Sequence, residues 1–446
     1  MNDRVVMPIW MFGVFIVIMN TTMFNVSIPS IIQELNITAD LGSWIISSYS
    51  IGYALSTVIY SRLSDSIPLR KLLLVGLTIL GLSSVIGVVA QDFSMLLAVR
   101  ILQSAGAGTM AGLGLVMASR YIPYNRRGRA IAMISTGSAM AFGFGPIIGG
   151  IIGQYIGFNG LFGVTCLILL VLPILMRLLP REEPKPSQFD VFGAVLTVVN
   201  AASLLIAVMQ RSIYWFVGSI LSIAVHAWYM KIVKKETFIN PKLFAAKDYR
   251  KLTMIGFCVL VLNLGNLFLM PLALANLAHE STLTIGLTIA PGAILSALLG
   301  RFIGQWIDRY GNIRFLLIGQ ILLAVVLAVF SFAIDVSPIV ILCGYLLFSP
   351  AFSATLSSLN NETSHILPKQ LIGSGMGLMQ LIQFFGGSIS VAVCGMILTM
   401  QNNIPLALAY EHVYRVLLVV CLLSLTISVW YKLSASRAEK LMQATA

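Results

Sequence analysis

Long apolar segments of about twenty residues follow one another along nearly all of this 446-residue chain. Twenty residues of α-helix rise about 30 Å, which matches the hydrocarbon core of a bilayer. Only 10% of the residues are charged, against about 25% in soluble proteins. A soluble core would also be divided into shorter apolar runs. The sequence therefore predicts an all-α polytopic membrane protein that contacts the lipid bilayer.

The apolar segments predict fourteen transmembrane helices. The first of them lacks the small-residue cleavage pattern of a removable signal peptide, so we expect it to be retained. The expected bounds are 6–28, 42–60, 72–90, 95–118, 130–153, 160–178, 191–210, 213–230, 252–275, 283–303, 315–334, 339–361, 371–398 and 413–431. No connection between them is long enough for a soluble domain.

Basic residues are concentrated on one side of this predicted bundle. Of 28 Lys and Arg, 25 lie at the side of the termini and of alternate loops, whereas the opposite loops hold only Arg211. By the positive-inside rule the basic side is cytoplasmic, which places both termini inside. The formal charge of +12 is thus a topology signal, and we do not expect nucleic acid as a partner.

Neither catalysis nor metal binding is indicated by the sequence. The five cysteines fall in apolar segments, and none stands in ligand spacing with a histidine, which is typical of small packing residues. There is no Walker loop and no catalytic triad. We expect no enzyme activity, no metal and no cofactor.

A similar short loop occurs in both halves of the chain, at 61–71 and 304–314. In each copy an Asp follows a small residue by four positions, and basic residues come next. Such a recurrence suggests an internal duplication, the usual plan of secondary transporters. The predicted units are an N-terminal six-helix bundle at 1–180, an inserted helix 7–8 hairpin with a cytoplasmic linker at 181–251, and a C-terminal six-helix bundle at 252–446.

The acidic residues of these two loops are Asp65 and Asp308. A carboxylate at a helix end can accept hydrogen bonds from a neighbouring helix N-terminus and pair with Arg. We therefore expect a gating latch that holds the outward-facing state. The basic residues expected to take part are Arg70, Arg309 and Arg314. The alternative is an ordinary charged turn.

Arg100 lies about six residues inside the outer end of the fourth predicted helix. An Arg at that depth is unfavourable by several kcal/mol unless it is paired or hydrated, which makes it a candidate functional residue. Gln103 follows nearly one turn later and can share its face. The alternative is that Arg100 extends to the outer interface.

The fifth predicted helix contains a dense set of helix-perturbing residues. Glycines permit very close helix contact, and proline frees a carbonyl and bends the helix. The set is Gly143, Gly145, Pro146, Gly149 and Gly150. It is the most specific pattern in the chain, and the alternative is a packing seam with no bearing on transport direction.

Polar and soft side chains recur on predicted helices that could face a central cavity. Flexible Met and aromatic walls suit a promiscuous apolar pocket, although most such residues are expected to pack against lipid. The candidate cavity residues are Asn20, Thr21, Met23, Phe24, Gln103, Asn263, Asn266, Gln380 and Gln383.

Carboxylates that could carry a proton are scarce. Glu362, at the cytoplasmic end of the twelfth predicted helix, is the deepest in the second half, and Glu34 and Asp40 are candidates at the outer side. A coupling carboxylate needs to be partly shielded from water. The alternative for Glu362 is a solvated residue at a helix end.

Taken together, these motifs resemble the major facilitator superfamily, specifically its fourteen-helix drug/proton antiporter branch, which includes Gram-positive tetracycline and multidrug exporters. The resemblance covers nearly the whole chain and is strongest over 20–150. It implies a monomer in the bacterial plasma membrane whose partners are small-molecule drugs and protons. It also implies that Arg100 takes part in proton coupling and that the glycines of the fifth helix mark an exporter.

The chain departs from the pattern of that family at several positions. In the first loop Ser61 and Pro68 stand in place of glycines, and Ser66 stands in place of an Arg. The acidic residues that the family carries in the first helix, near Asn20, and in the thirteenth, near Gly386, are missing. The resemblance therefore leaves open which of the carboxylates named above carries the proton.

Three functions follow from the sequence, in order of preference. The first is a proton-coupled exporter of structurally diverse amphipathic or cationic drugs and dyes that works by alternating access. The second is an exporter of narrow specificity, for a tetracycline-like compound or an endogenous metabolite. The third is an uptake symporter or a non-transporting receptor on the same scaffold.

Overall fold

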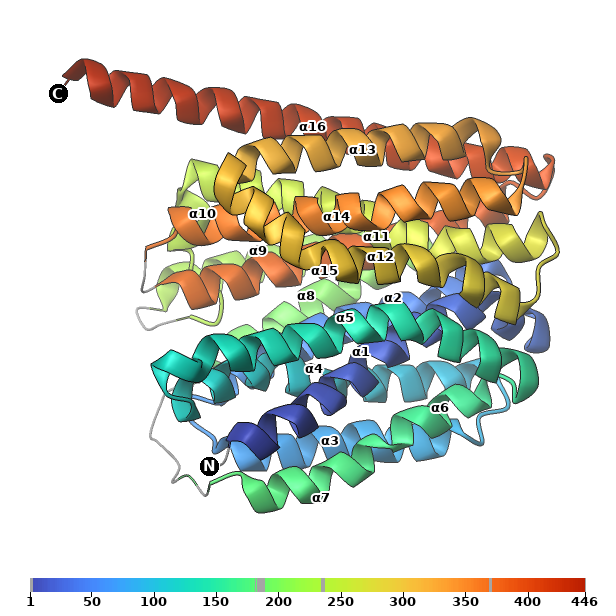
Figure 1. The fold of residues 1–446 in the computed structure, drawn as a ribbon, viewed down its shortest axis with the longest axis horizontal. Coiled ribbons are helices and arrows are strands. Elements are labelled where there is room, and N and C mark those ends of the chain that lie inside the picture. The colour runs from blue at the N-terminus through green and yellow to red at the C-terminus, as the bar shows by residue number, and fades with distance from the viewer. Residues whose placement is uncertain (1–2, 181, 183–188, 234–236, 369–370, 446) are drawn as a thin grey trace.

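The protein is described by a computed structural model over residues 3–180, 182, 189–233, 237–368 and 371–445, in which all regular structure is helical (Figure 1). The first half contains α1 (Asp3–Glu34), α2 (Ala39–Leu63), α3 (Leu69–Gly87), α4 (Phe93–Tyr121), α5 (Tyr124–Tyr155), α6 (Asn159–Cys166) and α7 (Ile168–Leu178). The remaining helices are α8 (Val191–Gln210), α9 (Ile213–Ile232), α10 (Lys242–Ala245), α11 (Lys247–Asn276), α12 (Thr282–Tyr310), α13 (Asn312–Ala333), α14 (Pro338–Ile366), α15 (Ile372–Met400) and α16 (Leu406–Thr445).

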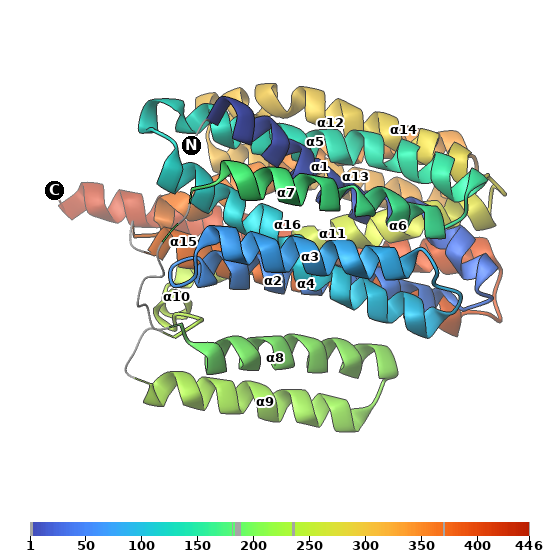
Figure 2. The same ribbon diagram turned by 90° about the horizontal axis from the view of Figure 1, so that it is seen from below.

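These helices form two bundles with a separate hairpin beside them. Helices α1–α7 make one bundle and α11–α16 the other, and Figure 2 shows α8 and α9 as a pair at one side. The predicted fold class is therefore confirmed. The start of α1 and the end of α16 lie at the same end of the molecule (Figure 1), which we call the inner end after the orientation that the sequence predicts. The predicted unit boundary at residue 181 lies outside the described residues.

Helix bounds differ from the prediction mainly at the polar ends. The first helix extends over Asp3–Glu34 rather than 6–28, because a helix continues past the apolar run that the bilayer requires. The sixth predicted helix is divided at Leu167 into α6 and α7. The short α10 was not expected.

Thirteen segments of the described chain are long and apolar enough to cross a membrane, and α6 with α7 counts as one of them. The second predicted span, α2, has 25 residues but is more polar, with buried serines at Ser43, Ser47 and Ser50. It packs between α4 and α15, so its hydroxyl groups contact protein rather than lipid. With α2, the chain has the fourteen long segments that the sequence predicts.

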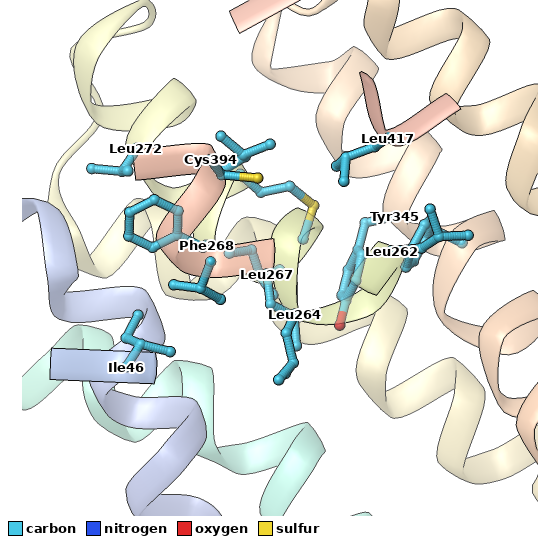
Figure 3. Packing of buried hydrophobic residues seen from close by; sticks show 14 of the residues in the cluster. Ile46, Leu262, Leu264, Leu267, Phe268, Leu272, Tyr345, Cys394 and Leu417 are labelled. Carbon is cyan, nitrogen blue, oxygen red and sulfur yellow. The ribbon is translucent and has the colours of Figure 1, made fainter. Parts of the chain in front are cut away.

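The largest hydrophobic core joins the two bundles and is built around α11. In the span of α11, 94% of the residues are buried, against 11% in α9. Figure 3 shows Leu267 and Phe268 of α11 at the level where Ile46 of α2 approaches. Because apolar contacts are not directional, this core can join the bundles without fixing one relative orientation.

The hairpin of α8 and α9 is closed at its inner end by Asp190. One carboxylate oxygen accepts hydrogen bonds from Gly193 N and Tyr229 Oη, at 2.8 and 2.7 Å, and the other accepts one from Phe238 N at 2.8 Å. Burial alone would raise the pKa of Asp190, but these hydrogen bonds outweigh burial and lower it. Asp190 therefore ties the start of α8 to the end of α9 and the following linker.

We expect Asp190→Ala to loosen the hairpin by about 2 kcal/mol, because it removes an N-cap and two further charge-assisted hydrogen bonds. Hydrogen exchange of the α8 and α9 amides would measure the effect. The matched control is Asp92→Ala, since Asp92 caps α4 with a single hydrogen bond to Met95 N and should have a smaller, local effect.

The folded-state pKa of Asp190 lies below its unfolded value, so its contribution is complete above about pH 4 and is lost as the pH falls further. The protection of the wild-type α8 and α9 amides from hydrogen exchange should thus be constant from neutral pH down to about pH 5. Equal protection in both alanine variants would contradict the assigned role.

Candidate functional site

Arg100 on α4 is the central polar group of the first bundle, and its side chain is only 1% exposed. One terminal nitrogen, Nη1, donates to Asn20 Oδ1 on α1 at 2.5 Å and to Gln103 Oε1 at 3.1 Å. The guanidinium carbon lies 4.0 Å from the ring centre of Phe24 and 3.8 Å from that of Tyr49. The side chain thus points into the bundle and does not extend to the outer interface.

The partners of Arg100 are held in turn by neighbouring helices. Asn20 Nδ2 donates to Thr165 Oγ1 on α6, and Gln103 Nε2 donates to Ser84 Oγ on α3, at 2.8 and 2.7 Å. We refer to Arg100 and its contacts Asn20, Gln103, Phe24 and Tyr49 as the arginine cage. It joins α1, α2 and α4 at the depth of the membrane.

No carboxylate is paired with Arg100 among the described residues. Its Nε atom is buried without a hydrogen-bond partner. The two aromatic faces supply cation–π attraction, which strengthens when the site excludes water. The arginine cage therefore holds a buried positive charge by neutral groups alone, and Asn20 occupies the position where a countercharge could sit.

The glycines of α5 form two seams on opposite faces of that helix. A side chain at Gly145 or Gly149 would collide with Thr22 or Met23 of α1. Two hydrogen bonds reinforce this seam. Thr22 Oγ1 donates to the carbonyl of Ala141 at 3.2 Å, and Ser27 Oγ donates to the carbonyl of Gly149 at 3.3 Å.

The other face of α5 meets α12 of the second bundle. A Cβ at Gly143 would lie 3.0 Å from Ile294, and one at Gly150 would lie 2.9 Å from the carbonyl oxygen of Thr282. Gly286 of α12 in turn packs on the carbonyl of Pro146. The predicted antiporter motif thus belongs both to the first bundle and to the contact between bundles.

Contact between α5 and α12 is confined to their middle and outer parts. At Gly300 and Gly304, towards the inner end of α12, a Cβ would find no heavy atom within 4 Å. Figure 1 shows the two helices close together in their middle and outer parts and diverging towards the end that carries the termini. This geometry corresponds to a state whose outer side is closed.

A cavity of about 10 Å³ remains inside the closed outer part, lined by residues that include Asn25, Pro146 and Tyr345. That volume accommodates about one water molecule, whereas sites for drug-sized ligands are about 300–1,000 Å³. A transported molecule therefore cannot occupy this level while the outer seam is closed.

The predicted cavity residues are divided among several environments. Thr21 lies beside the Tyr49 hydroxyl, and Met23 is enclosed in the α1–α5 seam. In the second bundle, Asn266 Oδ1 accepts from Tyr414 Oη at 3.1 Å, and Gln383 Nε2 donates to Asn360 Oδ1 at 3.4 Å.

Two further predicted cavity residues, Asn263 and Gln380, complete the set. Asn263 is 8% exposed, and Gln380 is half-buried near the inner end of α15. The structure does not bring the cavity residues of the two bundles into one pocket. Their assignment to a substrate site stays a prediction.

The gating residues lie at the inner surface. Asp65 forms an ion pair with Arg120 Nη2 of α4 at 2.9 Å, and Arg120 also donates to the Ser64 carbonyl. The N-terminus of α3 is occupied instead by Glu182, which accepts from Leu69 N at 2.6 Å. Asp65 is thus held within the first bundle, by an Arg that the sequence prediction did not name.

Of the remaining gating candidates, Arg70 is half-buried and Asp308, Arg309 and Arg314 are exposed. The Arg309 guanidinium lies 5.4 Å from the ring centre of Tyr310. The structure does not bring Asp65 and Asp308 to a common contact. Their gating roles stay predictions.

The carboxylates predicted to carry protons make no recorded contact with the arginine cage. Glu362 accepts from Asn312 Nδ2 of α13 and Tyr431 Oη of α16, at 2.9 and 2.7 Å, so both oxygens are bound within the second bundle. Asp40 Oδ1 accepts from Thr399 Oγ1 of α15 at 3.1 Å and therefore links the two bundles at the outer side. Glu34 is exposed at the end of α1.

Sequence reasoning missed three contributors to the site, namely Tyr49, Arg120 and Glu182. Tyr49 lies in a span whose aromatic residues carry no distinguishing spacing. Arg120 and Glu182 fall in segments that the sequence predicts as basic inner loops, where topology already accounts for charge, although Arg120 lies in the last turn of α4. Their partners follow from helix packing and could not be read from local patterns.

Two long helical bundles that close on one side around buried polar groups define a membrane transporter fold. The model of the Major Facilitator Superfamily matches residues 10–391. The chain belongs to this superfamily.

Relatives with similar sequences support the assignment. The chain is 24% identical to the uncharacterised MFS-type transporter YcnB of Bacillus subtilis (strain 168) over 413 residues, covering 90% of this chain and 87% of the relative. It is 25% identical to MdtD of Enterobacter sp. (strain 638), a candidate multidrug resistance protein, over 404 residues, covering 88% and 85%. It is 24% identical to the riboflavin transporter RibZ of Clostridioides difficile (strain 630) over 316 residues, covering 69% and 68%.

Solved structures share the fold. The D-xylose–proton symporter aligns with a TM-score of 0.71 at 13% identity, covering 95% of this chain and 96% of that one. A POT family transporter in complex with 5-aminolevulinic acid aligns with a TM-score of 0.73 at 14% identity, covering 96% of each chain. At these identities the likeness establishes the fold alone.

We expect Gly286→Val to prevent closure of the outer seam, because its side chain would collide with the carbonyl of Pro146. Overpacking of this kind is unfavourable by about 1–3 kcal/mol, enough to shift the balance of states about tenfold. To measure this, Ile289, which is buried beneath the seam, is replaced by a single cysteine. A membrane-impermeant maleimide added from outside then labels this cysteine only when the seam is open. Gly163→Val is the control, since a Cβ there meets nothing within 4 Å; equal labelling in both variants would refute a role for the seam.

Proposed function

We propose that the chain is a proton-coupled exporter of structurally diverse amphipathic molecules that works by alternating access. The observation that carries this proposal is the double seam of α5. One face is packed on α1, and the other closes on α12 only towards the outer side. A helix fixed in one bundle and in intermittent contact with the other is a suitable hinge for opening and closing the path.

Export rather than uptake is supported by the resemblance of the α5 glycines to the antiporter signature. The similarity to MdtD, whose name refers to multidrug resistance, points the same way. The similarity in fold to a proton symporter does not indicate the direction of transport.

The arginine cage favours neutral or anionic substrates over cationic ones. A buried unit positive charge is only weakly screened, and it disfavours a cation that approaches the interior of the bundle. Arg100 has no paired carboxylate among the described residues to cancel this field. Among the drugs and dyes expected from the sequence, the neutral and anionic amphipathic ones are therefore the better candidates.

For coupling, we propose that Asp40 is the proton-sensitive group of the outer seam. Its ionised carboxylate accepts a hydrogen bond from the Thr399 hydroxyl across the bundle interface, and a proton on that carboxylate would remove the charge that strengthens this bond. Glu362, whose partners lie in one bundle, remains the candidate at the inner side, and Glu34 is a further one at the outer side.

The first test is efflux of a neutral amphipathic dye from energised cells. An uncoupler should abolish efflux by the wild type, because the proton gradient drives it. Asp40→Asn should reduce the dependence of efflux on external pH, whereas Asp92→Asn, an outer N-cap away from the interface, should leave it unchanged. Efflux that continues without a gradient would reject coupling, and dye accumulation in place of depletion would indicate an uptake symporter.

A second test concerns substrate charge. Asn20→Asp places a carboxylate beside Arg100, and it should raise export of cationic dyes relative to anionic ones by about tenfold, since it cancels one unit charge. The control is Asn159→Asp, because Asn159 bonds the backbone of Val88 and Ala90 at the outer end of α3, away from the cage. An unchanged ratio in Asn20→Asp would show that the arginine cage does not select for charge.

A second candidate function is export of one planar compound class. The similarity to the riboflavin transporter RibZ and the aromatic residues Phe24 and Tyr49 at the cage favour it. A panel of unrelated toxic compounds decides between the two: protection against a single class would support the narrow exporter.

A further inference from the structure

A cavity of about 150 Å³ lies at the inner end of α11, against α15 and the short helix α10. It is distinct from the arginine cage and from the small cavity under the outer seam. Its lining residues are Phe244, Arg250, Thr253, Met254, Phe257 and Ile382.

The lining combines an apolar wall with two polar groups. Phe244 and Met254 are 40% and 50% exposed, so one side of the cavity is open at the surface of the bundle. Thr253 is only 6% exposed, and its hydroxyl has no hydrogen-bond partner among the described residues. The hydroxyl of the neighbouring Tyr249 donates instead to the carbonyl of Gly375. The Thr253 hydroxyl lies close to that of Tyr249 but makes no hydrogen bond of ordinary geometry among the described residues, so it can bond a ligand in the cavity.

The rim of the cavity is positively charged. Arg250 lines it, and Lys242 and Lys247 are exposed nearby in the chain. The one acid of this segment, Asp248, lies 3.2 Å from Lys251 and is paired with it. Basic groups at the end of a transmembrane helix meet the phosphates of anionic lipids.

The cavity is too small to enclose a drug-sized molecule but large enough for part of a lipid. The cavity of about 150 Å³ is much larger than the one of about 10 Å³ under the outer seam. Pockets for drug-sized ligands are at least twice as large, about 300–1,000 Å³. A segment of an acyl chain is narrow enough to enter, and its remainder could continue along the exposed side chains of Phe244 and Met254.

We propose that this cavity binds one anionic phospholipid of the inner leaflet. The guanidinium of Arg250 receives the phosphate, and the hydroxyl of Thr253 donates to an ester carbonyl of the glycerol. The first part of one acyl chain lies against Met254, Phe257 and Ile382. The site is independent of the proposed transport function, because it uses none of the residues assigned to transport.

The experiment is native mass spectrometry of the full chain, released from nanodiscs that contain equal amounts of phosphatidylglycerol and phosphatidylcholine. The wild type should retain phosphatidylglycerol about fivefold over phosphatidylcholine, the effect expected of one basic group near a lipid phosphate. Arg250→Gln should remove that preference. Thr253→Val, which is nearly isosteric, should reduce retention of both lipids while leaving the preference in place.

Arg177→Gln is the matched control, because Arg177 is an exposed Arg at the inner end of α7. It should behave as the wild type. Equal retention of the two lipids by the wild type, or the same loss in Arg177→Gln as in Arg250→Gln, would overturn the proposal. Displacement of the lipid by inorganic phosphate would also overturn it, because it would indicate an anion site without an acyl chain. Thermal unfolding of each variant shows whether it is folded, and Thr253→Val provides a second test if Arg250→Gln is not.

Discussion

The structure depends on the close approach of α5 to two helices at once. Glycine permits backbones to come within contact of one another, and α5 has glycines on both of its packed faces. Gly145 and Gly149 place it on α1, while Gly143 and Gly150 place it on α12. The first contact lies inside a bundle and is reinforced by hydroxyl–carbonyl hydrogen bonds. The second consists of van der Waals contact between bundles, and such a contact can be broken without leaving buried polar groups unpaired.

The arginine cage shows how a charge is kept in this interior. Arg100 donates to amide oxygens and lies between two aromatic rings. A carboxylate partner would form an ion pair whose strength changes with protonation, whereas Asn20 gives a bond that is independent of pH. The proposed proton response is therefore assigned elsewhere, to Asp40, whose hydrogen bond to Thr399 lies across the interface. In this proposal, charge selection belongs to the interior and the proton response to its edge.

Much of the fold could be predicted from the sequence, because the bilayer imposes a helix length and a charge asymmetry on the chain. The seam on α5 and the depth of Arg100 were visible for the same reason: glycine clusters and buried charges are rare in membrane helices. The partners were not predictable. Arg120 meets Asp65, and Tyr49 meets Arg100, only because three-dimensional packing brings α2 and α4 together. The low hydropathy of α2 also underestimates its tendency to cross the membrane, because its serines are buried against protein rather than exposed to lipid.

The inserted hairpin adds a constraint on how the bundles can move. Ala201 and Leu205 of α8 pack in one apolar cluster with Ile51 and Leu55 of α2 and with Leu381 of α15. The hydrogen bonds of the α8 side chains, among the described residues, go to the hairpin itself. A surface without directional bonds can slide against α2 and α15 while it keeps their shared edge covered. The hairpin therefore covers the interface without opposing the rotation of the bundles that the proposed mechanism requires, whereas a hydrogen-bonded cover would oppose it.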